Sequence, residues 1–297
     1  MANNLKDYSD QLAAVVEKAS ASVVTVSARQ GRAATGTVWE DGVVVTSSHA
    51  VVDEENITIR DADGDHAATL AGRDPGSDLA VLKVDGLKAT PASRGGDVRP
   101  GNLVVAVGRP SELRASVGHV VSLESRQRGW RGGLEGLVLS DAHLFQGFSG
   151  GPLVDAEGAV VAINSWYYGR GSTRSLTVAG ADRLVKSLLA HGRVKKPYLG
   201  IGTQPVRLGA ETAGKAGQEY GLMVIAVEAG SPAAAGGILQ GDTVVGIGEQ
   251  QVAGMRDLFR ALQALEVDAE QTIKVVRAGE LKDVKVTVGE RAEAQED

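Results

Sequence analysis

The chain contains no cysteine among its 297 residues. Disulfide bonds, thiolate zinc ligands and a cysteine nucleophile are therefore excluded, and the fold depends on its core alone. No apolar run reaches the roughly 18 residues that a helix needs to cross a bilayer. The first eight residues lack a basic segment followed by an apolar one, so we expect no signal peptide here. This predicts a cytoplasmic protein as the sequence stands, or a periplasmic one if a leader has been removed.

Aromatic side chains and net charge are also scarce. Three tryptophans, five tyrosines and three phenylalanines stand against 39 glycines, and the net charge is -6. The mild charge shows no basic patch that would suggest a nucleic-acid partner. Many glycines among short β-branched runs favour a mostly β chain with tight turns.

The first segment is the exception, because its apolar residues recur at helical spacing. Leu5, Tyr8, Leu12, Val15 and Val16 form one stripe, which predicts a helix over residues 5–19. The stripe docks either on its own domain or on a neighbouring subunit.

Short strands separated by turns follow from Ser22 to about Tyr168, which predicts a barrel or sandwich. Gly95-Gly96 and Arg99-Pro100-Gly101 lie near the middle and are placed to join two halves of similar size. The expected strands are Ser22–Ala28, Gly42–Thr46, Asn56–Arg60, Leu79–Val84, Leu103–Val107, Ser116–Leu123 and Ala159–Asn164.

A second domain is expected after a helix at Ala181–Ala190 and a polar stretch that ends before Pro197. Its strands are expected at Met223–Val227, Thr243–Ile247, Thr272–Arg277 and Val284–Val288, with helices at Ala233–Ile238 and Met255–Leu265. We therefore divide the chain into a helical segment (1–21), a first domain (22–190), a linker (191–196), a second domain (197–291) and a charged tail (292–297).

Ser149 is the candidate nucleophile, because it lies in Gly147-Phe148-Ser149-Gly150-Gly151. A serine hydroxyl needs a base to take its proton. Glycine on both sides lets the backbone expose the hydroxyl and lets the amides of Gly147 and Ser149 point at one place. Such a pair of amides forms an oxyanion hole. By itself the motif also fits an ordinary glycine-rich turn.

His49 and Asp78 complete a candidate catalytic triad. His49 follows the apolar strand at residues 42–46, and Asp78 lies in a polar turn before the strand at Leu79–Val84. Taken alone, each residue also fits a structural role, since single histidines are often structural and Asp is common at turns. The chain order His, Asp, Ser is that of the two-barrel serine proteases.

Together these motifs resemble the HtrA family of trypsin-like serine proteases, from about Ser22 to Glu290. The similar stretches are Thr46–Val52, Asp74–Lys83, Val98–Gly108, Ser140–Ala142 leading into Gly147–Leu153, and Tyr198–Ile201. The resemblance implies two β-barrels followed by a small α+β PDZ domain. It also implies that His49 is the general base, that Asp78 orients it, and that Ser149 attacks the peptide carbonyl.

One residue departs from the family pattern, and two stretches indicate the substrate specificity. HtrA proteins usually carry Asn before the catalytic serine, where this chain has Phe148. The pocket for the residue before the scissile bond is expected from Leu144–Phe148 and Ser165–Val178. Neither stretch contains an acidic residue, which favours small or medium apolar side chains over Lys or Arg.

The second domain resembles a PDZ domain, in which Tyr198-Leu199-Gly200-Ile201 matches the loop that binds a peptide carboxylate. Glycine allows close approach there, and the next strand edge accepts an added peptide strand. The alternative is a domain that only packs on the protease domain.

The resulting hypothesis is a serine endopeptidase of protein quality control that cuts unfolded or exposed polypeptides and binds peptide C-termini. No phosphate-binding loop or metal-ligand cluster stands out in the sequence, so we expect no cofactor or metal. The family resemblance implies a homotrimer. The alternative is a catalytically silent chaperone or peptide-binding scaffold, whose only support is the unusual segment His143–Phe148.

Overall fold

The computed structural model describes residues 4–29, 31–124, 136–168, 173–195 and 197–290. The chain divides into two compact units, Met1–Val194 and Lys195–Asp297. The division falls inside the predicted linker, whose last residue lies outside the described residues. Residues 1–3 and the predicted tail at 292–297 also lie outside them.

The first half of unit one is a closed barrel of six strands in the order β1-β2-β3-β6-β5-β4. Valine, isoleucine and leucine side chains such as Val24, Ile59 and Leu82 fill its interior and are wholly buried. The strands are β1 (Val23–Ser27), β2 (Ala34–Glu40), β3 (Val43–Ser47), β4 (Ile57–Arg60), β5 (Asp65–Asp74) and β6 (Leu79–Val84).

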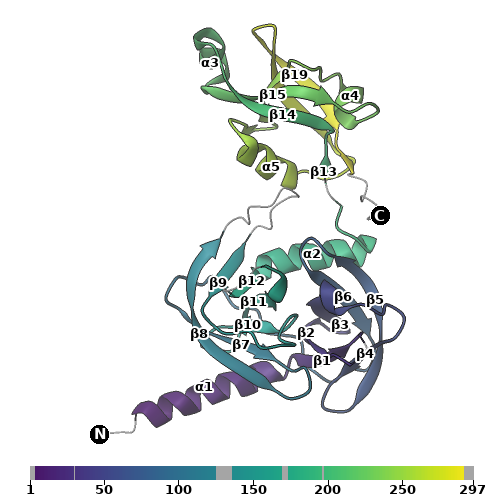
Figure 1. Cartoon of the computed structure of the whole chain (residues 1–297), viewed down its shortest axis with the longest axis vertical. Helices are drawn as coiled ribbons and strands as arrows, with labels where there is room; N and C mark the ends of the chain where they lie inside the picture. Colours follow the sequence, from purple (N-terminus) through teal and green to yellow (C-terminus); the bar gives the residue numbers. More distant parts are fainter. Residues whose placement is uncertain (1–3, 30, 125–135, 169–172, 196, 291–297) are drawn as a thin grey trace. The chain divides into compact units, whose positions relative to one another are not determined.

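The second half is another closed six-stranded barrel, in the order β10-β11-β12-β9-β8-β7 (Figure 1). The predicted two-barrel division is thus confirmed, with the expected Gly-rich connection between β6 and β7. The strands are β7 (Leu103–Gly108), β8 (Arg114–Glu124), β9 (Leu137–Ser140), β10 (Pro152–Val154), β11 (Val160–Ser165) and β12 (Thr173–Thr177).

Helix α2 (Val178–His191) packs against strands of both barrels. It begins where the Thr177 side chain caps the Gly180 amide and ends at Gly192 in the left-handed conformation. Asp182 of α2 accepts a 2.9 Å hydrogen bond from the indole of the buried Trp39 in β2. The Arg94 guanidinium stacks 4.6 Å from the Trp39 ring and lies 3.3 Å from the Asp182 carboxylate. These contacts join the helix to the first barrel and to the chain between the barrels.

Helix α1 (Asn4–Ser20) covers the predicted helical segment, and its apolar stripe has two parts. Leu12, Val15 and Val16 pack against the core shared by the barrels and α2. Leu5 and Tyr8 are 83% and 48% exposed. The C-terminal half of the stripe therefore docks on its own domain, whereas the N-terminal half leaves apolar surface open.

Unit two contains an antiparallel sheet in the order β14-β15-β16-β18-β19, with β17 paired to β16 and a separate β13-β20 pair. Its core includes the buried Leu222, Val244 and Ile273. The strands are β13 (Pro197–Tyr198), β14 (Ile201–Arg207), β15 (Tyr220–Val227), β16 (Thr243–Ile247), β17 (Gln250–Gln251), β18 (Glu270–Arg277), β19 (Glu280–Thr287) and β20 (Gly289–Glu290). The helices are α3 (Ala210–Ala216), α4 (Pro232–Gly236) and α5 (Met255–Gln263).

Candidate active site and peptide-binding loop

His49 lies in a single 3-10 turn, η1 (Ser48–Ala50), directly after β3. Its Nδ1 atom is 2.9 and 2.8 Å from the two carboxylate oxygens of Asp78. Its backbone amide donates a further 2.9 Å hydrogen bond to Asp78 Oδ1. The imidazole is therefore fixed on its Nδ1 side, while its side chain stays 44% exposed. This leaves the Nε2 side available to a reacting group.

Asp78 stands immediately before β6, and its carboxylate is almost completely buried. Its φ of +49° lies in the left-handed region, which costs a non-glycine residue about 1–2 kcal/mol. Ser165 at the end of β11 donates a 2.5 Å hydrogen bond to Asp78 Oδ2. The backbone carbonyl of Asp78 accepts from the Ser48 amide at 3.1 Å. These bonds hold the strained turn and aim the carboxylate at His49.

The environment of His49 raises its pKa above the ordinary value of 6.5. The largest cause is the hydrogen bond to Asp78, which stabilises the imidazolium. Partial burial opposes the increase, the negative charge of Asp78 adds to it, and the charge of Arg29 slightly opposes it. The arrangement thus makes the ring a stronger base than free histidine.

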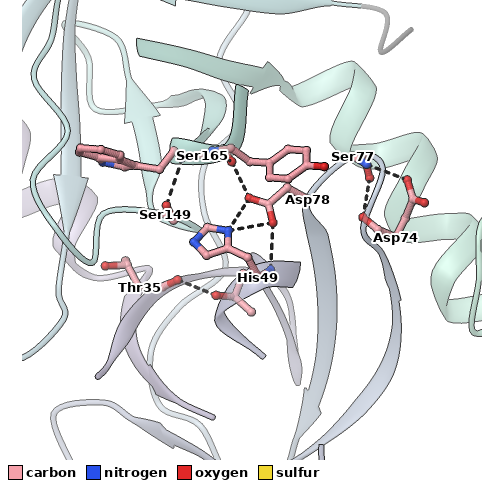
Figure 2. A network of polar contacts seen from close by, with 10 residues as sticks. Thr35, His49, Asp74, Ser77, Asp78, Ser149 and Ser165 are labelled. Carbon is pink, nitrogen blue, oxygen red and sulfur yellow. Dashed lines mark hydrogen bonds and ion pairs between the residues drawn. The ribbon is translucent and has the colours of Figure 1, made fainter. Parts of the chain in front are cut away.

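Ser149 lies between β9 and β10, and Figure 2 shows the His49 imidazole between its side chain and the Asp78 carboxylate. The Ser149 hydroxyl oxygen accepts a 3.2 Å hydrogen bond from the amide of Trp166. Within the described residues no hydrogen bond joins this hydroxyl to His49. Hydrogen bonds between catalytic groups are often long or poorly aligned before substrate binds. The three predicted residues therefore lie together around the His49 imidazole (Figure 2).

The loop around Ser149 turns at two glycines in the left-handed region. Gly147 has φ +87° and Gly150 has φ +85°. A Cβ at Gly150 would lie 2.2 Å from the carbonyl oxygen of Thr35, so the backbone approach requires glycine. Within the described part of the chain, the amides of Gly147 and Ser149 donate to no protein acceptor. Both amides are thus available to a negatively charged oxygen.

In unit two, the predicted carboxylate loop leads into β14, which is an edge strand. Gly200 has φ +80°, and a Cβ there would lie 2.2 Å from the Ser231 Cβ. The carbonyls of Leu199 and Gly200 accept from the amides of Ala233 and Glu228. The amides of Leu199 and Gly200 donate to no acceptor among the residues that the structure describes. Free amides before an open strand edge suit a terminal carboxylate.

Two curated relatives are similar to this chain along most of its length. A probable periplasmic serine endoprotease DegP-like from Rhizobium meliloti is 35% identical over 263 residues, which are 85% of this chain and 52% of the relative. Its counterpart from Chlamydia pneumoniae is 30% identical over 264 residues, 85% of this chain and 54% of that protein. The chain thus spans about half the length of these relatives.

Family models and solved structures agree with this match. The trypsin-like peptidase domain matches residues 34–163, and the PDZ domain matches residues 197–288. The HtrA-type protease AlgW with tripeptide aligns with a TM-score of 0.79 at 26% identity, over 95% of this chain and 98% of that one. The chain belongs to the HtrA family. The predicted fold, a two-barrel trypsin-like domain followed by a PDZ domain, is confirmed.

Phe148, the residue at which this HtrA chain departs from the usual Asn, is a core residue of the second barrel. It is fully buried, and its ring contacts Phe145 edge to face with ring centroids 5.6 Å apart. A Cβ at Gly108 would lie 2.5 Å from the Phe148 ring, so β7 accommodates the ring by carrying glycine at its end. The ring therefore anchors the loop by packing instead of by polar contacts.

The predicted specificity pocket is only partly described, because residues 169–172 lie outside the described residues. Leu144 is buried in the second barrel core, whereas Phe145, Trp166 and Tyr167 are 46%, 55% and 62% exposed. The indole of Trp166 donates a 3.2 Å hydrogen bond to the Leu144 carbonyl. The described part thus exposes aromatic side chains on both stretches of the predicted pocket, and the preference for apolar side chains stays a prediction.

The sequence did not indicate the contacts that support this HtrA site. Ser165 orients Asp78, the Trp166 amide contacts Ser149, and Thr35 contacts the loop at Gly147. Each lies far along the chain from its partner and carries no motif of its own. No helix within the described residues is long and apolar enough to cross a membrane.

Proposed function

We propose that this HtrA chain is a serine endopeptidase that cleaves unfolded or exposed polypeptides through His49, Asp78 and Ser149. The observation that carries the proposal is the His49 imidazole, bonded through Nδ1 to the buried Asp78 carboxylate and facing Ser149 (Figure 2). That bond selects the tautomer with Nε2 unprotonated, which is the form that can accept the serine proton.

In the proposed reaction, the Ser149 hydroxyl rotates from the Trp166 amide and transfers its proton to His49 Nε2. The serine oxygen then attacks the peptide carbonyl, and the new oxyanion accepts hydrogen bonds from the amides of Gly147 and Ser149. His49 returns the proton to the leaving amine, and the C–N bond breaks. Water then hydrolyses the acyl-enzyme with His49 again acting as base. No step uses a metal or a cofactor.

We further propose that the loop Tyr198–Ile201 binds the carboxylate of a peptide C-terminus through the amides of Leu199 and Gly200, and that the peptide adds to β14. The similar solved structures include HtrA-type protease AlgW with a decapeptide and with a tripeptide. The Thr203 hydroxyl, near the start of β14, lies 3.3 Å from the Met255 sulfur of α5. Helix α5 therefore flanks the first residues of this strand. This arrangement supports the PDZ mode of peptide binding.

We also propose how the protein assembles and where it is located. The exposed Leu5 and Tyr8 on α1 support an intersubunit contact in a homotrimer. The curated relatives are named periplasmic, which supports a periplasmic location with a leader removed.

The decisive test is Ser149→Ala. We expect this variant to lose cleavage of a permanently unfolded protein substrate by several orders of magnitude, because the triad acts as a unit. Its thermal unfolding should match that of the wild type, since only one hydroxyl is removed. Full cleavage by the purified variant would refute the assignment.

A fluorophosphonate probe distinguishes the enzyme from the silent scaffold. Labelling of wild-type protein at Ser149, and none of Ser149→Ala, supports the endopeptidase. If the wild type is never labelled, with or without added C-terminal peptide, the scaffold is the better description.

A further inference from the structure

Thr35 of β2 connects the first barrel to the loop that carries the nucleophile. Its hydroxyl donates a 2.6 Å hydrogen bond to the Gly147 carbonyl and accepts a 2.7 Å hydrogen bond from the Arg109 amide. Its own backbone amide donates to the Ser149 carbonyl at 3.3 Å. The residue is completely buried, so it does not touch a substrate.

Thr35 contacts Gly147 and Ser149, the two residues whose amides form the proposed oxyanion hole. The Gly147 and Ser149 carbonyls are both held by Thr35, whereas their amides donate to no acceptor in the described part of the chain. Gly147 is in the left-handed region, where glycine has several alternative conformations at similar energy. The Gly147 carbonyl and the Gly147 amide belong to successive planar peptide units joined at its Cα, so a hydrogen bond that fixes the carbonyl restricts the amide through the φ and ψ angles of Gly147.

The hydrogen bond from the Arg109 amide fixes the position of the Thr35 hydroxyl. Arg109 directly follows β7 of the second barrel, so the hydroxyl bridges that barrel and the loop from a strand of the first. A hydroxyl has one proton and two lone pairs, and here the proton is committed to Gly147 while a lone pair is committed to Arg109. The Thr35 carbonyl in turn accepts from the Thr46 hydroxyl at 2.8 Å, which adds a further link within the first barrel.

We propose that Thr35 is a positioning residue that sets the geometry of the oxyanion hole. The proposal rests on the proposed endopeptidase function, because it concerns the same loop. Its consequence is that loss of the hydroxyl impairs stabilisation of the tetrahedral intermediate more than binding of the substrate. Misplacement of a catalytic group by about 1 Å can reduce rates by about 100-fold.

Thr37, two residues along the same strand, provides a matched control. It is also completely buried, and its hydroxyl donates a 2.9 Å hydrogen bond to the carbonyl of Gly150. The Gly150 amide is committed to the Asn164 carbonyl at 2.8 Å and is no part of the hole. Thr37→Val thus removes a buried threonine-to-loop hydrogen bond without releasing Gly147.

The test compares the wild type with Thr35→Val, Thr35→Ser and Thr37→Val in the full chain. We expect Thr35→Val to lower kcat for a short chromogenic peptide about 10- to 100-fold with KM changed less than about 3-fold. Affinity for a peptidyl trifluoromethyl ketone, whose hemiketal carries an oxyanion, should fall by a similar factor. Thr35→Ser should restore both quantities, and Thr37→Val should retain them within about 3-fold.

Thermal unfolding of each variant separates positioning from loss of fold. If Thr35→Val does not fold, Thr35→Ala removes the same hydroxyl with less steric demand and carries the same expectation. Equal losses in kcat and ketone affinity for the Thr35 and Thr37 variants would overturn the proposal, as would wild-type values in a folded hydroxyl-free Thr35 variant. A wild type that a fluorophosphonate never labels would instead refute the endopeptidase function itself.

Discussion

At the scale of single residues, one buried carboxylate controls both the tautomer and the basicity of His49. Asp78 accepts from His49 Nδ1, from the His49 amide and from Ser165, so its orientation is determined by three donors. A buried carboxylate that gives up its hydration needs such partners. The same hydrogen bond that orients the imidazole also raises its pKa.

The pH dependence follows from the sign of this shift. The proposed mechanism requires neutral His49, so kcat/KM should fall as the pH drops through the His49 pKa. Because that pKa is raised, we expect the midpoint of the acid limb above pH 6.5. The measurement is kcat/KM for a short peptide between pH 5 and 9, with circular dichroism confirming the fold at each pH. A flat profile from pH 5 to 8 would contradict a histidine base.

Asp78→Asn provides the matched variant for this profile. The amide carries no charge, so the midpoint should move to lower pH than in the wild type. An Asn side chain that donates to His49 Nδ1 would place the ring proton on Nε2, where it blocks acceptance of the Ser149 proton. We therefore expect kcat to fall on the order of 10⁴-fold. An unchanged midpoint would show that Asp78 does not set the His49 pKa.

Sequence motifs were sufficient to single out His49, Asp78 and Ser149, which lie together in the structure, because the chemistry of a triad restricts which residues stand beside each; their catalytic roles stay a prediction. They were insufficient for Thr35 and Ser165. The partners of these residues are 112 and 87 positions away in the chain, so their contacts exist only once the barrels have closed.

At the scale of secondary-structure elements, β6 and β2 show why one strand was predicted and another was missed. The strand β6 (Leu79–Val84) coincides with its prediction, whereas β2 was missed. The sequence of β2 contains Thr35, Gly36 and Thr37, which look like a turn. The threonines are buried because distant loop carbonyls satisfy their hydroxyls, which cancels the cost of burying a polar group. No local pattern records that compensation.

Helix α1 gives a prediction at this scale, because its two halves differ. Leu5→Glu with Tyr8→Glu should lower the oligomer mass measured by light scattering, since the charges replace exposed apolar surface on the proposed trimer contact. The thermal midpoint of the separated subunit should change little at these exposed positions. An unchanged trimer, or a wild-type monomer, would refute the intersubunit role of α1.

Leu12→Ala is the control for the same helix. Leu12 packs against the shared core of its own domain, so its truncation should destabilise the fold by about 2–3 kcal/mol. The oligomer mass of the folded variant should not change. A loss of oligomer mass in the first variant and a loss of stability in the second would separate contact between subunits from docking on the domain.

At the scale of the whole molecule, a trypsin-like unit and a PDZ unit follow each other along the sequence with almost no intervening chain. Unit one ends at Val194, and the carboxylate loop begins at Tyr198. The sequence predicted this succession because each domain carries its own motifs and hydrophobic pattern. How binding in one unit affects the other depends on energy differences between conformations, which no motif encodes.

The position of the Ser149 hydroxyl is a feature that a bound ligand could change. The Ser149 hydroxyl accepts from the Trp166 amide and makes no hydrogen bond to His49 within the described residues. A ligand shifts such an equilibrium only through its different affinities for the two states. Coupling between two sites typically amounts to about 1–3 kcal/mol, which corresponds to about 5- to 150-fold in an equilibrium constant.

We therefore expect a peptide with an apolar C-terminal residue to raise kcat/KM for a short chromogenic substrate about 5- to 150-fold at saturation. The C-terminally amidated peptide is the matched control, because it lacks the carboxylate that we propose binds to the amides of Leu199 and Gly200. If the PDZ domain only tethers substrates, deletion of residues 197–297 should weaken cleavage of unfolded proteins and leave the short substrate unchanged. Free peptide would then compete with protein substrates. Calorimetry establishes that the peptide is bound in each assay, so a short-substrate rate that stays constant at saturation would exclude allosteric activation and leave the tether.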